Sequence, residues 1–200
     1  LSTHDLSVTV LTEPLVQSSL PAVLSMMRVL QERAVAPQHA GLFASPEPLC
    51  RRRADAMVTK IFAVGGKDGN FTRLSSVECF DSLTGEWSAV AAMSTARFRH
   101  GVAVVDGKMH AVGGIDATNT ALSSVEYFDP STGQWSAVAA MSTARYGHGV
   151  AVVGDKLYAV AGYDGNYLSS VECFDPSTGQ WSAVADMSTA RYGTGVGVVD

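Results

Sequence analysis

Apolar and polar positions alternate in short runs along most of this chain. Residues 100–114, HGVAVVDGKMHAVGG, are two valine-rich runs joined at Asp106-Gly107. This dipeptide is a strong hairpin signal, because a two-residue turn needs positive φ at both central positions. Two further runs follow, SSVEYFD at 123–129 and WSAVAAM at 135–141. The pattern predicts four short antiparallel strands.

The same pattern is written three times. Residues 129–153 and 175–199 differ at three positions, and residues 81–105 are a third copy, so a unit of about 48 residues recurs. Periods of this length are typical of stacked or radial repeat architectures. A four-stranded sheet with this period indicates a propeller blade, because radial packing buries both faces of each sheet and leaves only short edges.

Three features recur in phase and resemble the kelch repeat over about residues 60–200. They are a glycine pair (Gly65-Gly66, Gly113-Gly114, with Ala161-Gly162 in the third copy), an aromatic residue (Phe80, Phe128, Phe174) and a tryptophan seven residues later (Trp87, Trp135, Trp181). The resemblance implies an all-β fold, a partial kelch β-propeller of three four-stranded antiparallel blades. We expect the fold to tolerate the departure at Ala161.

The repeats divide the chain into two parts. We expect residues 1–56 to be a linker or remnant, poorly structured or with a short helix at 19–34, and residues 57–200 to hold the blades, at about 57–93, 98–141 and 146–187, with an extra strand at 194–199. No first strand is recognisable before the first unit, so the sequence looks like a fragment of a propeller. An open arc exposes apolar blade faces, and we expect it to self-associate, for example by pairing two arcs into a six-bladed ring.

The charge balance limits the classes of partner, and the cysteines bear on the cellular compartment. The chain has 14 basic and 19 acidic residues, a net charge of −5, and no basic stripe for nucleic acid. No apolar run is long enough to span a membrane. Cys79 and Cys173 share a repeat position with Tyr127, so we expect no disulfide between them. A reducing, cytoplasmic location fits this pattern.

Comparison of the copies separates scaffold positions from variable ones. Variation concentrates after the glycine pair (KDGNFTRL, IDATNTAL, YDGNYL) and after the shared arginine (FRHG, YGHG, YGTG). Both zones are predicted loops, where binding residues usually sit. The resemblance implies that they open on one face, which commonly binds proteins. The predicted partner-binding residues are Lys67, Asp68, Asn70, Phe71, Arg99, Ile115, Asn119, Tyr146, Tyr163, Asp164, Tyr167 and Tyr192.

Some of these positions have structural alternatives. Tyr146 and Tyr192 are equally suited to packing between blades. The shared arginines (Arg97, Arg145, Arg191) recur with three glutamates (Glu78, Glu126, Glu172), which favours an ion pair or backbone contact over a ligand role. Thr194 replaces His100 and His148 in the third copy, which favours hydrogen-bonded or solvated histidines over metal ligands.

These observations predict a protein-binding module. By resemblance, its role is substrate recognition for a cullin-RING ubiquitin ligase adaptor, although no segment matches the BTB or BACK domains of such adaptors. An actin or cytoskeletal scaffold is the alternative. A copper radical oxidase of the galactose-oxidase type needs converging Tyr and His ligands, which the repeat histidines His100, His110 and His148 do not supply. We therefore expect no enzyme activity, no metal and no cofactor.

Overall fold

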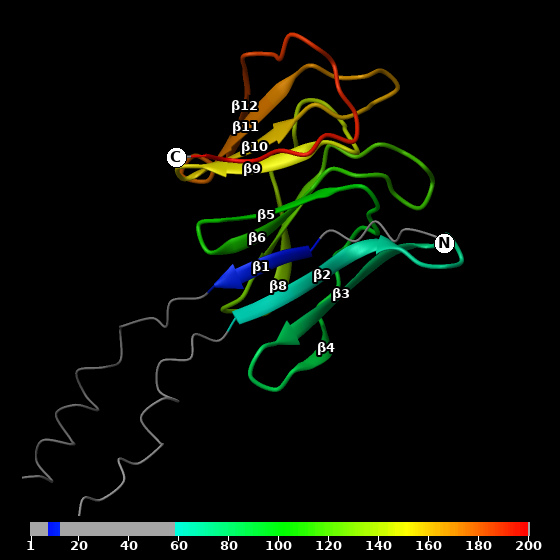
Figure 1. Ribbon diagram of the computed structural model, residues 1–200, viewed down its shortest axis with the longest axis vertical. Coiled ribbons are helices and arrows are strands. Elements are labelled where there is room, and N and C mark those ends of the chain that lie inside the picture. Colours follow the sequence, from blue (N-terminus) through cyan, green and yellow to red (C-terminus); the bar gives the residue numbers. More distant parts are fainter. Residues whose placement is uncertain (1–7, 13–58, 200) are drawn as a thin grey trace, which may run out of the picture. The chain divides into compact units, whose positions relative to one another are not determined.

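The computed structural model describes residues 8–12 and 59–199, which form three four-stranded sheets and contain no helix (Figure 1). Blade 1 contains β1 (Val8–Thr12), β2 (Thr59–Lys67), β3 (Arg73–Asp81) and β4 (Glu86–Val90). Blade 2 contains β5 (Gly101–Val105), β6 (Lys108–Val112), β7 (Val125–Asp129) and β8 (Gln134–Val138). Blade 3 contains β9 (Gly149–Val153), β10 (Lys156–Val160), β11 (Val171–Asp175) and β12 (Gln180–Val184). The predicted all-β fold of three four-stranded blades is confirmed.

Blade 1 obtains its fourth strand from an unexpected place. The sequence predicted that blade 1 would start at its second strand, but β1 lies beside β2 and completes the sheet. Its sequence, VTVLT, shares little with the HGVAVV of the other blades. Backbone hydrogen bonds do not require a particular side chain, so a repeat comparison misses such a strand. The helix predicted at 19–34 lies outside the described residues.

Residues 194–199, predicted as an extra strand, form no ladder. They run beside β9 (Figure 1). A Cβ built on Gly149 would lie 2.2 Å from Val196 Cγ2, just as one built on Gly101 would lie 2.3 Å from Val150 Cγ1. The segment therefore follows β9 as β9 follows β5. It occupies the place that the first strand of a next blade would take.

The hydrophobic core lies between the blades rather than within them. Phe62 of blade 1 is buried with Met109 and Phe128 of blade 2, and the ring centroids of Phe62 and Phe128 are 5.6 Å apart. The equivalent cluster between blades 2 and 3 contains Leu157 and Phe174. Because each cluster draws on two neighbouring blades, a single repeat cannot bury its own apolar surface.

The repeat tryptophans join each blade to the preceding one. Trp135 Nε1 donates to the Ala91 carbonyl at 2.9 Å, and Trp181 Nε1 donates to the Ala139 carbonyl at 2.9 Å. The Trp135 ring also packs on Phe128 of its own blade, with centroids 5.5 Å apart. The aromatic residues of the repeat motif are thus scaffold.

The glycine pair allows the chain at the end of the second strand to pass close to the backbone of the connection that leads to the next blade. Gly113 has φ of 58°, and a Cβ built on it would lie 2.5 Å from the Arg145 carbonyl oxygen. Ala161 keeps the same left-handed conformation, with φ of 65°, although an L-residue rarely adopts it. The fold holds alanine there by enclosing it, since Ala161 is fully buried.

Gly113→Ala is expected to destabilise the protein more than Gly107→Ala does. Gly107 has φ of 66° with no atom within 4 Å of a built Cβ, so its replacement costs only the left-handed strain of about 1–2 kcal/mol. At Gly113 the backbone of Arg145 must also move, which adds about 1–3 kcal/mol. Urea unfolding of both variants measures the difference. Equal losses would show that contact with Arg145 does not constrain this position.

Candidate protein-binding face

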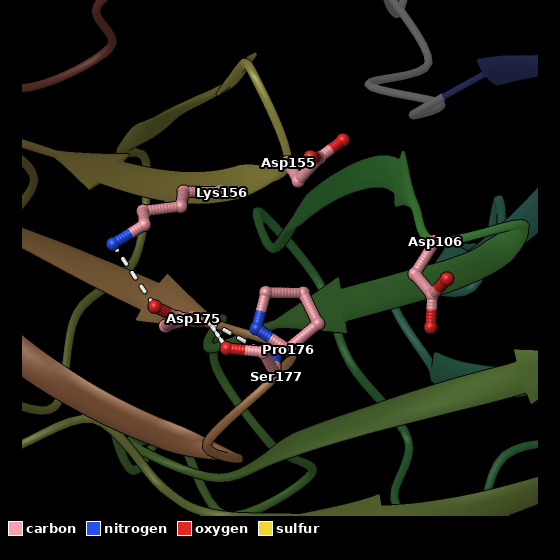
Figure 2. A pocket seen from close by; sticks show the side chains of 6 residues that line it. All are labelled: Asp106, Asp155, Lys156, Asp175, Pro176 and Ser177. Atoms are coloured by element: carbon pink, nitrogen blue, oxygen red, sulfur yellow. Dashed lines mark hydrogen bonds and ion pairs between the residues drawn. The ribbon is translucent and has the colours of Figure 1, made fainter.

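A hollow of about 390 Å³ opens at the end of blades 2 and 3 where their hairpin turns lie (Figure 2). Asp175 lines it and accepts hydrogen bonds from the Ser177 backbone at 2.9 Å and the Ser177 hydroxyl at 2.6 Å. The Ser177 hydroxyl and the Lys156 ammonium, 2.9 Å away, lower the pKa of Asp175 to about 2. Asp129 and Ser131 make the same turn in blade 2. The polar groups that line the hollow are therefore already used in the hydrogen bonds of the repeat turns.

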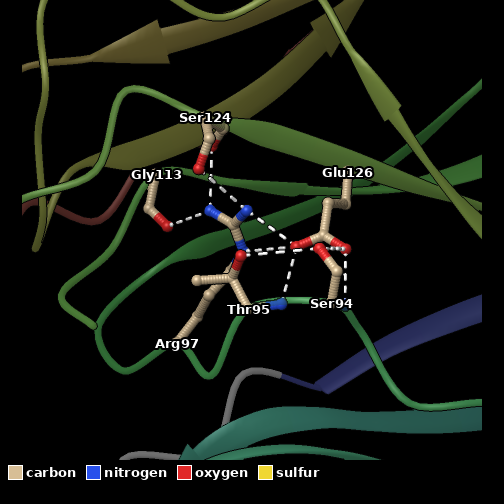
Figure 3. Close-up of polar contacts among 6 residues, drawn as sticks. All are labelled: Ser94, Thr95, Arg97, Gly113, Ser124 and Glu126. Atoms are coloured by element: carbon tan, nitrogen blue, oxygen red, sulfur yellow. Dashed lines mark hydrogen bonds and ion pairs between the residues drawn. The ribbon is translucent and has the colours of Figure 1, made fainter. Parts of the chain in front are cut away.

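The shared arginines hold neighbouring blades together (Figure 3). Arg97 is fully buried, and its Nη2 lies 2.9 Å from Glu126 Oε1 of the next blade. Its Nη1 donates to the carbonyl oxygens of Gly113 at 2.9 Å and Ser124 at 2.8 Å. Glu126 also accepts from the backbone and the hydroxyl of Ser94, both at 2.7 Å. We call this arrangement the arginine clamp, and the predicted structural ion pair is confirmed.

Blade 3 repeats the arginine clamp. Arg145 Nη2 lies 2.7 Å from Glu172 Oε1, and Arg145 Nη1 donates to the Ala161 and Ser170 carbonyls at 2.8 and 3.0 Å. Burial alone would raise the pKa of Glu172, but the hydrogen bonds from Ser142 and Arg145 outweigh it and keep that pKa below its usual value. Both carboxylates are therefore ionised partners of buried arginines.

The two repeat histidines lie in the protein interior beside the clamps. His100 and His148 are both buried. Burial and the charge of Arg97 lower the pKa of His100 to about 4, while burial and the charge of Arg145 lower that of His148 to about 3. Both rings are therefore neutral near pH 7. Within residues 8–12 and 59–199, no three His, Cys, Asp or Glu side chains are grouped so as to hold a metal ion.

The two variable zones meet on one face of the blades. Phe98 and Ile115 exchange backbone hydrogen bonds of 3.0 and 2.8 Å, and Tyr146 and Tyr163 exchange bonds of 3.1 and 3.0 Å. Each pair joins the connection entering a blade to the loop between its second and third strands. These backbone bonds hold the two variable loops of each blade together, so that their side chains project from a fixed backbone.

Four tyrosines cluster where these variable loops meet. The Tyr163 centroid lies 5.5 Å from the centroids of both Tyr146 and Tyr167, and 6.0 Å from that of Tyr192. Tyr167 is 65% exposed, whereas the other three rings are half-buried. The edge-on contacts fix the rings without burying them completely. Tyr146 and Tyr192, whose centroids are 5.7 Å apart, therefore pack on neighbours and also reach solvent.

Two cations extend the tyrosine cluster towards blade 1. Arg99 donates to the Tyr192 hydroxyl, and its guanidinium carbon lies 5.2 Å from the centroid of the Phe98 ring. Lys67 Nζ lies 4.7 Å from the same centroid and 4.6 Å from that of Phe71. Phe71 is 69% exposed. We define the loop face as this continuous set: Lys67, Phe71, Phe98, Arg99, Tyr146, Tyr163, Tyr167 and Tyr192.

The other predicted contact residues also take part in the internal structure of the loops. Asp68 Oδ1 accepts from the backbone of Asn70 at 2.9 Å, and Asp164 Oδ1 accepts from that of Asn166 at 2.9 Å. Ile115 is only 8% exposed, so its side chain lies beneath the face. Asn119, in the loop of blade 2, accepts a hydrogen bond from Arg73 of blade 1.

Sequence reasoning missed two members of this region. Phe98 is a buried ring shared by Lys67 and Arg99. Its signal was its place in the variable stretch FRHG, at the repeat position of Tyr146 and Tyr192. Arg73 links the loops of blades 1 and 2 through Asn119. The signal for Arg73 was its absence from the other copies, in which Ala121 and Tyr167 precede the shared leucine.

Strained backbone also concentrates in these loops. Phe71 and Arg99 have φ of 64° and 55°, in the left-handed region that bulky residues rarely enter. Such strain persists only where the surroundings impose it, and it gathers at functional sites. Here the two strained residues carry exposed side chains of the loop face.

Comparisons with known proteins agree with this architecture. The sequence model of the KLHDC2/KLHL20/DRC7 Kelch-repeats domain matches residues 34–198. A solved structure, "Structure of YjhT", superimposes with a TM-score of 0.57 at 19% sequence identity, covering 66% of this chain. The match covers 51% of that protein, so the chain spans about half its length. Among the described residues, no helix has the length and hydropathy to cross a membrane.

The buried histidines predict a stability that falls on mild acidification. An unfolded histidine takes up a proton near pH 6.5, whereas folded His100 and His148 resist protonation until about 4 and 3. The free energy of unfolding should therefore fall between pH 6.5 and 4.5, by about 1.4 kcal/mol per pH unit for each histidine. Urea unfolding across this range measures the slope.

The variant His100→Thr/His148→Thr is the matched control, because Thr194 stands at the same repeat position. It should remove the part of the pH dependence of the unfolding free energy that these two histidines contribute. His110, whose pKa burial also lowers, should account for part of the remainder. An unchanged slope would show that His100 and His148 are not the groups responsible.

Proposed function

The chain belongs to the kelch-repeat family, and we propose that it is a protein-binding module whose ligand lies across the loop face. One observation carries the proposal: the positions that vary among near-identical repeats come together as one aromatic and cationic surface. Positions fixed by the repeat hold the blades, whereas these positions are free to serve a partner.

The chemistry of the loop face suits a protein ligand. Tyrosine, arginine and other aromatic residues are enriched among the residues that dominate protein interfaces. Tyr167 and Phe71 offer exposed rings, and Arg99 offers an exposed guanidinium between them. The rings are held by neighbouring rings and cations, so little side-chain freedom remains to be lost on binding.

The finer proposal is recruitment of the bound protein to a cullin-RING ubiquitin ligase. It is supported by family membership, since kelch domains of adaptor proteins present their substrates through such a face. A cytoplasmic location agrees with it, because Cys79 and Cys173 are buried free thiols that suit a reducing compartment. Actin binding is the alternative use of the same face.

The variant Phe71→Ser/Arg99→Glu/Tyr167→Ser should lose partner capture and keep its fold. All three side chains are exposed, so their replacement should cost little stability. Tyr163 and Tyr192 are left intact because they are half-buried. In affinity capture from cytosol with quantitative mass spectrometry, the proteins retained by the wild type should fall at least about tenfold. Circular dichroism should remain unchanged.

The matched control is Leu83→Ser/Lys156→Glu, which alters exposed residues at the turn end of the blades. It should capture partners as the wild type does. Equal losses in both variants, or none in either, would place binding elsewhere. A cullin among the loop-dependent proteins supports the adaptor role, whereas co-sedimentation of the wild type with purified actin filaments supports the alternative.

A further inference from the structure

A second, smaller hollow of about 110 Å³ lies between blades 2 and 3, beside the hollow shown in Figure 2. Asp106 and Pro176 line both hollows, and no residue of the loop face lines either of them. Blade 2 contributes His110 and Tyr127 to the smaller hollow, and blade 3 contributes Phe174. The smaller hollow therefore exists only where these two blades meet.

His110 stands where the other repeats have a different ring. Its equivalents are Phe62 in blade 1 and Tyr158 in blade 3. Phe62 packs on Phe128 of blade 2 with ring centroids 5.6 Å apart, and His110 packs on Phe174 of blade 3 with centroids 5.8 Å apart. A hydrocarbon ring thus satisfies this position in a blade junction. The blades do not require the polar atoms of His110, which makes this a variable position of the kind found in the loops.

One nitrogen of His110 is left for a ligand. The residue is 3% exposed, and its Nδ1 donates to the Lys108 carbonyl at 3.1 Å. Burial lowers the pKa of His110, so the ring is neutral near pH 7 and its Nε2 carries a lone pair. No described residue donates a hydrogen bond to Nε2. Because a buried acceptor without a donor is unfavourable, the hollow suits a ligand that brings a donor.

The walls of the hollow are aromatic and apolar. Tyr127 is paired with His110 across β6 and β7, with ring centroids 5.7 Å apart, and Val138 of β8 also lines the hollow. The charged lining residues are Asp106 and Lys108, one of each sign. An ion of either sign would therefore meet a like charge, whereas a neutral planar ring would bury its apolar surface against the walls.

We propose that this hollow binds the side chain of a tyrosine from a protein partner, whose hydroxyl donates a hydrogen bond to His110 Nε2. A cavity of about 150 Å³ accommodates benzene, so an open hollow of about 110 Å³ admits one six-membered ring. Tyrosine joins such a ring to a hydrogen-bond donor, and it is a common anchor of protein interfaces. Because the site lies at the turn end of the blades, it is independent of the function proposed for the loop face.

Titration of the 200-residue chain with N-acetyl-L-tyrosine amide, followed by heteronuclear NMR, tests the site. The His110 Nε2 resonance and the amide resonance of Gly179, which also lines the hollow, should shift saturably with the same dissociation constant. N-acetyl-L-phenylalanine amide leaves Nε2 without a donor, so it should bind at least about tenfold more weakly. Equal affinities of the two amides, or no shift at either resonance, would overturn the proposal.

The variant His110→Phe gives blade 2 the residue that blade 1 has at Phe62, so the junction should stay packed. It removes the acceptor and keeps a ring. The two amides should then bind with equal affinity, at the level of the phenylalanine amide on the wild type. A tyrosine amide that keeps its advantage in this variant would show that His110 does not accept from the hydroxyl. The comparison of the amides on the wild type stands whether or not this variant folds.

Two controls locate the binding and identify its source. The loop-face variant Phe71→Ser/Arg99→Glu/Tyr167→Ser should bind the tyrosine amide with unchanged affinity, because these residues do not line the hollow. A loss of affinity in this variant would place the binding on the loop face and contradict the proposal. The free phenol p-cresol should also shift the Gly179 resonance, since it carries the same ring and hydroxyl. Binding of p-cresol without binding of the tyrosine amide would show that the hollow admits only free phenols, and would overturn the assignment to a protein tyrosine.

Discussion

The buried ion pair between each connection and the following blade is the interaction on which the rest of the structure depends. Arg97 and Arg145 are fully buried, and each is paired with a glutamate whose other oxygen accepts from a serine. A buried charge without its partner costs several kcal/mol, so the blades can meet in only one register. The apolar clusters between blades bury nonpolar surface, and the arginine clamp fixes the register in which the blades meet.

The arginine clamp also determines how the variable residues are displayed. The Arg97 and Arg145 carbonyls accept hydrogen bonds from Gly66 and Gly114, at 2.8 and 2.9 Å. Each connection is therefore held by its arginine side chain on the next blade and by its backbone on the preceding one. Residues that follow the arginine, such as Arg99, start from a rigid point. Rigid presentation of variable side chains is the property that a binding scaffold requires.

The repeat made most of the fold predictable from sequence. Asp106-Gly107 indicated its hairpin, and both residues have positive φ, 51° and 66°. Comparing the copies separated the clamp arginines from the loop residues. Contacts between repeats were harder to predict, because a sequence does not say which blade a side chain faces. Thus Glu126 pairs with the arginine of the preceding blade, and Phe98 joins two cations from different blades. β1 escaped prediction because its strand pairing leaves no repeat signature.

A double-mutant cycle on Arg97 and Glu126 tests the central claim most directly. Unfolding by urea would be measured for Arg97→Met, Glu126→Met and the double variant. If the clamp fixes the junction, each single change should cost about 3–5 kcal/mol, since it leaves a buried charge without its partner. The double change should cost less than the sum of the single changes by at least about 1 kcal/mol. Strictly additive losses would contradict the account, because they would show that the two side chains stabilise the blades independently.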